Sequence, residues 1–142
     1  MCSNRIGRTA RDPRAVFEHW QSSPASPTLR LVDRSVYVDM YRAMPDCVGG
    51  LGVMGKINLS VKSEGLRLEH WMRGRQIAWI RTDHDRWVGI VIVDAHSTNG
   101  LSSVTMTLWL PPGAFQLDQP EDWYTREMAP WIGPRASTGP GI

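Results

Sequence analysis

The fold is decided by residues 56–110, which read KINLSVKSEGLRLEHWMRGRQIAWIRTDHDRWVGIVIVDAHSTNGLSSVTMTLWL. Apolar residues recur there mostly at every second position, and short polar clusters interrupt them. A period of two is the period of a β-strand with one buried face. We therefore predict that the centre of the chain folds as a small antiparallel sheet.

This pattern predicts about five short strands separated by polar turns. The strands are expected at residues 57–61, 66–71, 77–81, 87–94 and 104–110, and the turns at Glu64-Gly65, Arg73-Gly74-Arg75, Thr82–Asp85 and His96–Gly100. The nearly unbroken apolar run in residues 87–94 is typical of a central strand that is covered on both faces. Strands joined in succession by tight turns indicate a meander that curls toward a barrel.

Two short helices are predicted before the sheet. Asp12 can cap the first, and Pro13 suits its first turn. The second, at residues 34–44, has an alternative. As a helix it would carry Tyr37 and Tyr41 on one stripe, whereas as a strand its two valines would share one face. We favour the helix, because Asp33 before this segment and Pro45 after it are suitable end signals.

The fold class is therefore α+β: a small antiparallel β-meander or partly open barrel of about five strands, preceded by one or two short helices. The predicted organisation is a flexible basic arm (1–11), a helical N-terminal segment (12–45), a β-barrel-like core (46–117) and a Pro/Gly-rich C-terminal tail (118–142). In that tail, residues 121–128 could form one or two helical turns.

Composition is that of a single globular domain. The 142 residues carry a net charge of +2, and seven Trp stand against two Phe. Nearly all cations are Arg, whose planar fork matches phosphate and carboxylate groups. Cys2 and Cys47 are isolated from each other, so we expect reduced thiols in a cytoplasmic protein. No apolar run is long enough for a membrane span, and no membrane partner is expected.

Motifs for nucleotide binding do not have the sequence context that they need. Residues 50–55 match G-x-G-x-x-G, but a predicted strand follows them where a dinucleotide site requires a helix N-terminus. We interpret these residues as a pliable connector, and no cofactor is expected.

Metal and hydrolase sites are equally unsupported. Asp83, His84 and Asp85 are expected at a solvated hairpin tip, not around a metal ion. A triad of Asp94, His96 and Ser97 would require neighbours on one loop to align as acid, base and nucleophile, which they do not normally do. We therefore predict no catalytic residue and no metal site, and the chain is interpreted as more consistent with a non-enzyme than with an enzyme.

The remaining candidate is a basic-aromatic sheet face. Arginine can hold phosphates by charge, and tryptophan can stack on unpaired bases or on arginine-containing peptides. We predict a binding or accessory module that contacts nucleic acid or a protein partner through this face. The predicted binding residues are Arg67, Trp71, Arg73, Arg75, Arg81 and Arg86.

Two alternatives stay open. In the first, a small-ligand binding protein or hydrolytic enzyme has a pocket in the barrel mouth, lined by Trp79, Trp87 and Trp109 with His70 or His96 as its polar group. In the second, a structural subunit docks through the C-terminal tail that carries Trp123 and Trp131.

Overall fold

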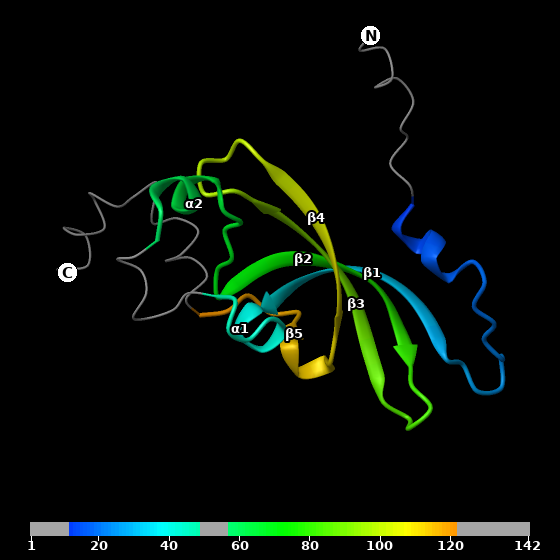
Figure 1. Cartoon of the computed structure of the whole chain (residues 1–142). Helices are drawn as coiled ribbons and strands as arrows, with labels where there is room; N and C mark the ends of the chain where they lie inside the picture. Colours follow the sequence, from blue (N-terminus) through cyan, green and yellow to red (C-terminus); the bar gives the residue numbers. More distant parts are fainter. Residues whose placement is uncertain (1–11, 49–56, 122–142) are drawn as a thin grey trace, which may run out of the picture.

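One antiparallel sheet of five strands organises the molecule (Figure 1). The computed structural model describes residues 12–48 and 57–121. Across the sheet the strand order is β4-β3-β2-β1-β5, so the first four strands form a meander and β5 returns beside β1. The sheet is open, with β4 and β5 at its edges, and does not close into a barrel. The strands are β1 (Leu29–Asp39), β2 (Trp71–Arg81), β3 (Trp87–His96), β4 (Ser103–Leu110) and β5 (Phe115–Gln116).

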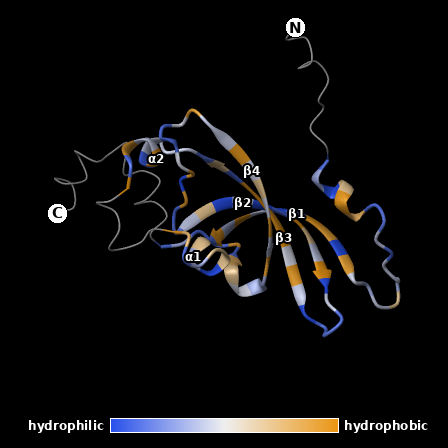
Figure 2. Cartoon of the chain, in the orientation of Figure 1, coloured by the Kyte–Doolittle hydropathy of each residue, from blue (hydrophilic) through white to orange (hydrophobic). Residues whose placement is uncertain are grey.

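The later part of the meander agrees with the sequence pattern. β3 and β4 occupy the predicted ranges to within two residues, and their hairpin contains Gly100 with a φ of 75°. The hairpin between β2 and β3 closes at Thr82–Asp85 as expected. The apolar patterns of these strands predicted them correctly, because each strand buries apolar residues in the sheet. Figure 2 shows the hydrophobic segments along β3 and β4.

The predicted helix at residues 34–44 is wrong, because β1 continues through Asp39 and only Met40–Ala43 forms a helix, α1. Asp39 caps this helix, since its side chain accepts a hydrogen bond from the N–H two residues later. Val36 and Val38 are fully buried on the sheet. Pairing with β2 and β5 on either side outweighs the helical spacing of the tyrosines.

Two further predictions are corrected between residues 57 and 75. Residues 57–61 are not a strand, because Leu59–Glu64 forms helix α2, which Asn58 caps. Leu59 and Val61 are largely exposed, so their alternation reports no buried sheet face. Residues 66–70 likewise lie outside the named strands, and an isolated bridge joins Leu66 to Ser97.

The predicted turn at Arg73-Gly74-Arg75 is in fact the interior of β2. Glycine is required there for close packing and not for a turn. A Cβ atom on Gly74 would lie 2.8 Å from Val91 Cγ1 and 2.9 Å from the carbonyl oxygen of Ile92. Because polar arginines flank Gly74, the segment looks like a turn in the sequence.

Both faces of the sheet carry apolar clusters. The side of the sheet that bears Val36, Val91 and Leu110 is called the inner face. Helix α1, the 3₁₀ helix η4 (Pro112–Ala114) and Phe115 pack against it. The outer face is the opposite side, where the 3₁₀ helix η2 (Pro13–Phe17) contributes its one buried residue to a second cluster. The η2 helix begins after Asp12 as predicted, with the Asp12 side chain accepting from the N–H of residue 14.

Several predicted features fall outside the described residues. They are the basic arm at 1–11, the glycine-rich connector, the helical turns predicted at residues 121–128 beyond residue 121, and the tail tryptophans Trp123 and Trp131.

Candidate arginine–tryptophan binding site

Five of the six sequence-predicted binding residues are divided between the two ends of β2, and Arg75 lies between them. Arg67, Trp71 and Arg73 lie at or just before its beginning, where β2 and β3 separate after the pair Arg75–Ile92. Arg81 and Arg86 lie at the other end, around the hairpin to β3. The single face expected from the sequence is therefore two separate regions.

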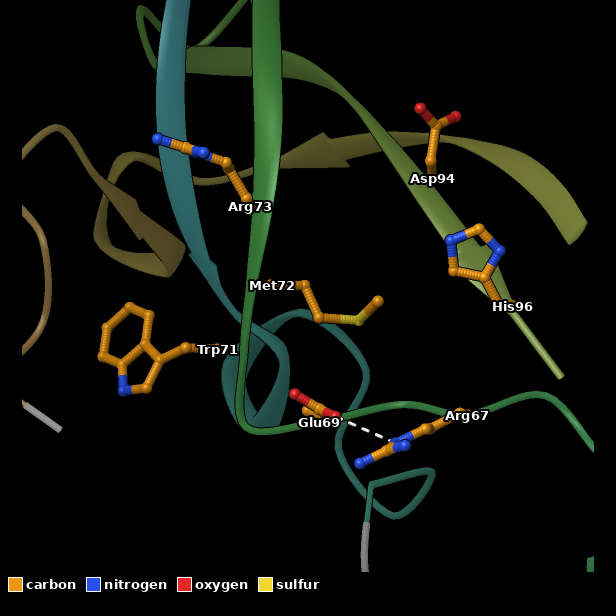
Figure 3. A pocket seen from close by; sticks show the side chains of 7 residues that line it. All are labelled: Arg67, Glu69, Trp71, Met72, Arg73, Asp94 and His96. Atoms are coloured by element: carbon orange, nitrogen blue, oxygen red, sulfur yellow. Dashed lines mark ion pairs between the residues drawn. The ribbon is translucent and has the colours of Figure 1, made fainter. Parts of the chain in front are cut away.

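The first region is a pocket of about 220 Å³ at the start of β2 (Figure 3). We call it the split-strand pocket. Met72 extends into the space between β2 and β3, and Arg73 points away from Asp94. The residues lining it are Arg67, Glu69, Trp71, Met72, Arg73, Asp94 and His96.

Charges in the split-strand pocket compensate one another. Arg67 Nε lies 2.9 Å from a carboxylate oxygen of Glu69 (Figure 3). Arg73 lies over the ring of Tyr37, with 5.8 Å between its Cζ and the ring centroid. Two arginines and two carboxylates, with Asp94 as the second carboxylate, thus give this pocket no excess positive charge when its histidine is neutral.

Arg75 belongs to neither end region. It forms an ion pair with Asp33, and the hydrogen bond from Arg75 lowers the pKa of the Asp33 carboxyl below its usual value. Because both side chains are exposed, this ion pair orients two surface side chains but contributes little to the free energy of unfolding. Arg75 is therefore less available to an anionic ligand than an unpaired arginine.

The second region lies on the inner face near the β2–β3 hairpin. Strand register places Arg30 opposite Trp79, and Arg81 opposite Trp87. Residues directly opposite in an antiparallel pair point to the same side of the sheet, and residues two apart on one strand do so as well. All four side chains therefore share the inner face.

Guanidinium groups stack on both indoles of this region. The Cζ atoms of Arg30 and Arg81 lie 5.4 Å and 5.5 Å from the ring centroid of Trp87. That of Arg34 lies 5.8 Å from the ring centroid of Trp79. At these distances the ring quadrupole attracts the cation and holds a long side chain that would otherwise sample many rotamers.

A buried amide fixes Arg34 further. Gln76 is fully buried, and its Oε1 accepts a hydrogen bond of 2.7 Å from Arg34 Nε. Its amide nitrogen donates to the carbonyl oxygen of Ala78 at 3.1 Å. Both ends of the amide are therefore satisfied, as burial of a polar group requires. The Arg34 guanidinium group is therefore positioned by two contacts, the hydrogen bond to Gln76 and the ring of Trp79.

Two open pockets flank Trp87. One, of about 330 Å³, is lined by Arg30, Trp79, Trp87 and Pro112. The other, of about 550 Å³, is lined by Asp85, Arg86, Trp87, Val88, Trp109, Pro111 and Pro112. Because they share Trp87 and Pro112, the two pockets adjoin each other and make one surface around this end of the sheet, which reaches the outer face at Val88 and Trp109.

This surface has an excess of positive charge. Its four arginines are Arg30, Arg34, Arg81 and Arg86, and its carboxylate is Asp85, which pairs with Arg81. The hydrogen bond from Arg81 lowers the pKa of the Asp85 carboxyl, so Asp85 is ionised at neutral pH. We call these five residues together with Trp79 and Trp87 the Arg–Trp site.

Sequence reasoning identified Arg81 and Arg86 but missed Arg30 and Arg34. The signal that could have found them is the strand interpretation of residues 34–44, which would have extended β1 beside β2. Arg30 and Arg34 are four residues apart, so simple alternation along such a strand places them on one face.

The alternative pocket that combined three tryptophans with a histidine is not assembled. Trp79 and Trp87 line one pocket, and Trp87 and Trp109 line the other. His70 lies elsewhere, with its Nε2 3.2 Å from Asp39. His96 lines the split-strand pocket.

The candidate metal and hydrolase residues form no such site. Within residues 12–48 and 57–121, no group of three His, Cys, Asp or Glu side chains could hold a metal ion. The Ser97 hydroxyl donates to Asn99 Oδ1 at 2.6 Å and is part of the β3–β4 turn. Asp94 accepts from Thr105 at 2.8 Å. Neither residue is bonded to His96 in the way that a triad needs.

Comparison of the chain with protein-family models, with curated proteins and with solved structures gives no match. In the described part of the chain, no helix has the length and apolar character needed to cross a membrane. We therefore infer the function from the geometry and charge of the Arg–Trp site.

Proposed function

We propose that this protein is a non-enzymatic binding module that binds single-stranded nucleic acid at the Arg–Trp site. The observation that carries the proposal is the stacking of Arg30 and Arg81 against one indole, Trp87, beside two open pockets. A cytoplasmic location, where such ligands occur, is part of the same proposal.

Phosphate recognition follows from the preorganised arginines. A guanidinium group offers several N–H donors in a planar fork that suits phosphate oxygens. Ordering a free arginine side chain costs conformational entropy, and the indoles and Gln76 have already restricted these side chains. Binding therefore loses less entropy here than it would at mobile surface arginines.

Single strands are favoured over duplexes because of the aromatic component. Unpaired bases can stack on tryptophan rings or on the planes of bound guanidinium groups, whereas paired bases are already stacked within the helix. The two pockets beside Trp87 offer room for groups of this kind along a surface that is partly apolar.

The test is fluorescence anisotropy with a labelled mixed-sequence single-stranded oligonucleotide, measured between ~50 and ~200 mM salt. We expect affinity to fall steeply with salt because counterions are released from the neutralised phosphates. Arg30→Glu combined with Arg81→Glu should weaken binding by about 100-fold, since two charge-assisted contacts of about 1.5 kcal/mol each are lost.

The matched double variant is Arg67→Glu with Arg73→Glu at the split-strand pocket, for which we expect less than about threefold weakening. Equal weakening by both double variants would contradict the placement of the site. Absence of any oligonucleotide binding at ~50 mM salt would reject the nucleic-acid proposal itself. Binding of an acidic peptide in its place would assign the site to a protein partner.

A further inference from the structure

β4 is an edge strand made of uncharged residues. It pairs with β3 at every position from Ser103 to Leu110, without a register shift. In residues 12–48 and 57–121 no strand pairs with its outer edge. An edge strand presents backbone N–H and C=O groups that can pair with another chain.

Proteins usually block such an edge, and β4 lacks the common means of doing so. Its sequence, SVTMTLWL, contains no charged residue, no proline and no glycine. Inserted lysines, prolines or bulges are the devices that normally prevent edge-to-edge pairing. The side chains of Val104 and Trp109 are about half exposed, at 48% and 52%.

The opposite edge of the sheet is protected by contrast. β5 is two residues long and pairs with Tyr37 and Val38, so the rest of this edge is β1. β1 has a register shift between Leu31 and Arg34, and its charged residues include Arg30 and Asp33. The guanidinium group of Arg14 donates to the carbonyl oxygen of Val32 at 2.9 Å, so one acceptor of this strand is already occupied. β4 is therefore the edge at which backbone groups could pair with a strand of another chain.

We propose that β4 pairs antiparallel with β4 of a second copy of this chain, so that two five-stranded sheets become one continuous sheet. The strand is self-complementary for this purpose. Val104, Met106 and Leu108 lie on the inner face, while Thr105 and Thr107 lie on the outer face. In a twofold register centred on Met106, Val104 meets Leu108 and Thr105 meets Thr107.

Pairs of this kind are favourable in antiparallel sheets, because apolar side chains meet each other and threonines meet threonines. No like charges face each other across the twofold axis, since the strand has none. The axis would be perpendicular to the sheet, so the inner faces of both copies continue on one side. This inference does not depend on the proposed function.

The test combines sedimentation velocity with hydrogen exchange followed by mass spectrometry, on the full chain without nucleic acid. We expect a species of twice the 16.0 kDa chain mass at high protein concentration. Amides of β4 should become better protected as concentration rises, while those of β2 stay unchanged. The exchange comparison uses the native sequence, so it remains decisive if a variant fails to fold.

A double variant then tests the strand directly. Val104→Lys with Thr107→Lys introduces charge at both faces of the edge and should weaken self-association at least tenfold. Leu31→Lys, at an exposed apolar position of β1, is the matched control and should leave self-association unchanged. Circular dichroism checks that both variants keep the sheet.

Three outcomes would overturn the proposal. They are a monomer at all concentrations, self-association that survives the β4 double variant, or protection of β4 that does not depend on concentration. The last outcome would show that a segment of the same chain covers this edge.

Discussion

The two ends of β2 have similar side chains but different net charges. At the split-strand pocket, Arg67 and Arg73 share their surroundings with two carboxylates. At the Arg–Trp site, β1 contributes Arg30 and Arg34, and the carboxylate is Asp85 of the β2–β3 turn. The comparison shows that local composition does not define a binding surface, because the strands packed beside it decide its net charge.

The two ends also differ in how their tryptophans are used. Trp79 is part of the inner-face cluster, with its ring centroid 5.5 Å from that of Phe115. Trp71 instead stacks on His70 next to α1, at 5.1 Å and an interplanar angle of 24°. Trp79 therefore connects the Arg–Trp site to the core, whereas Trp71 packs against the ring of His70.

The largest expected effect follows from this difference. Trp79→Ala should lower the free energy of unfolding by about 3 kcal/mol, because it removes a large side chain that packs on the core and on Phe115. Trp71→Ala should lower it by less than about 1 kcal/mol. Urea unfolding of both variants measures the two values, and equal losses would mean that both ends are packed alike.

A smaller effect is expected from Trp87→Ala. The protein should keep its fold by circular dichroism, while oligonucleotide affinity falls about tenfold, because both guanidinium groups lose the ring that orders them. Trp71→Ala is the matched control for binding and should change affinity less than twofold. An unchanged affinity for the Trp87 variant would remove the indole from the proposed mechanism.

The smallest effect is a gain. Asp85→Asn should raise oligonucleotide affinity about threefold at low salt, because it releases Arg81 and removes one negative charge from the site. The low pKa of Asp85 means that the full charge is present at neutral pH. Asn tolerates the backbone conformation there, in which φ is 62°.

Glu69→Gln is the corresponding change at the split-strand pocket, where it releases Arg67 from its partner. We expect no gain in affinity from it, although the charge change is the same. A gain of similar size in both variants would show that binding responds to the charge of the whole protein and not to the Arg–Trp site.

Much of the sheet could be predicted from alternation, but the site could be predicted only in part. β4 has a regular period of two, β3 is the nearly unbroken apolar run that is typical of a central strand, and the turns around them contain typical turn residues. Residues 57–61 also have a period of two, but residues 59–61 belong to helix α2 and no strand of the described residues pairs with them. Alternation therefore predicts a strand reliably only where the fold supplies a neighbour.

Arg81 and Arg86 were among the predicted binding residues because arginines and tryptophans cluster along that part of the sequence. Arg30 and Arg34 were not predicted because the helical spacing of Tyr37 and Tyr41 masked a strand. The register shift between Leu31 and Arg34 decides which residues of β2 lie opposite the two arginines. Such a shift depends on how β1 fits β2, which involves residues more than 40 positions apart.

By itself, the sequence determined that this chain builds an antiparallel sheet with tight hairpins, because periodicity and turn chemistry are local properties. The tertiary structure decided that β1 is a strand, that Gly74 lies inside β2, and that Arg30 and Arg34 join Trp79 and Trp87. The physical reason is that cross-strand pairing and net charge arise between segments, and a single segment contains neither.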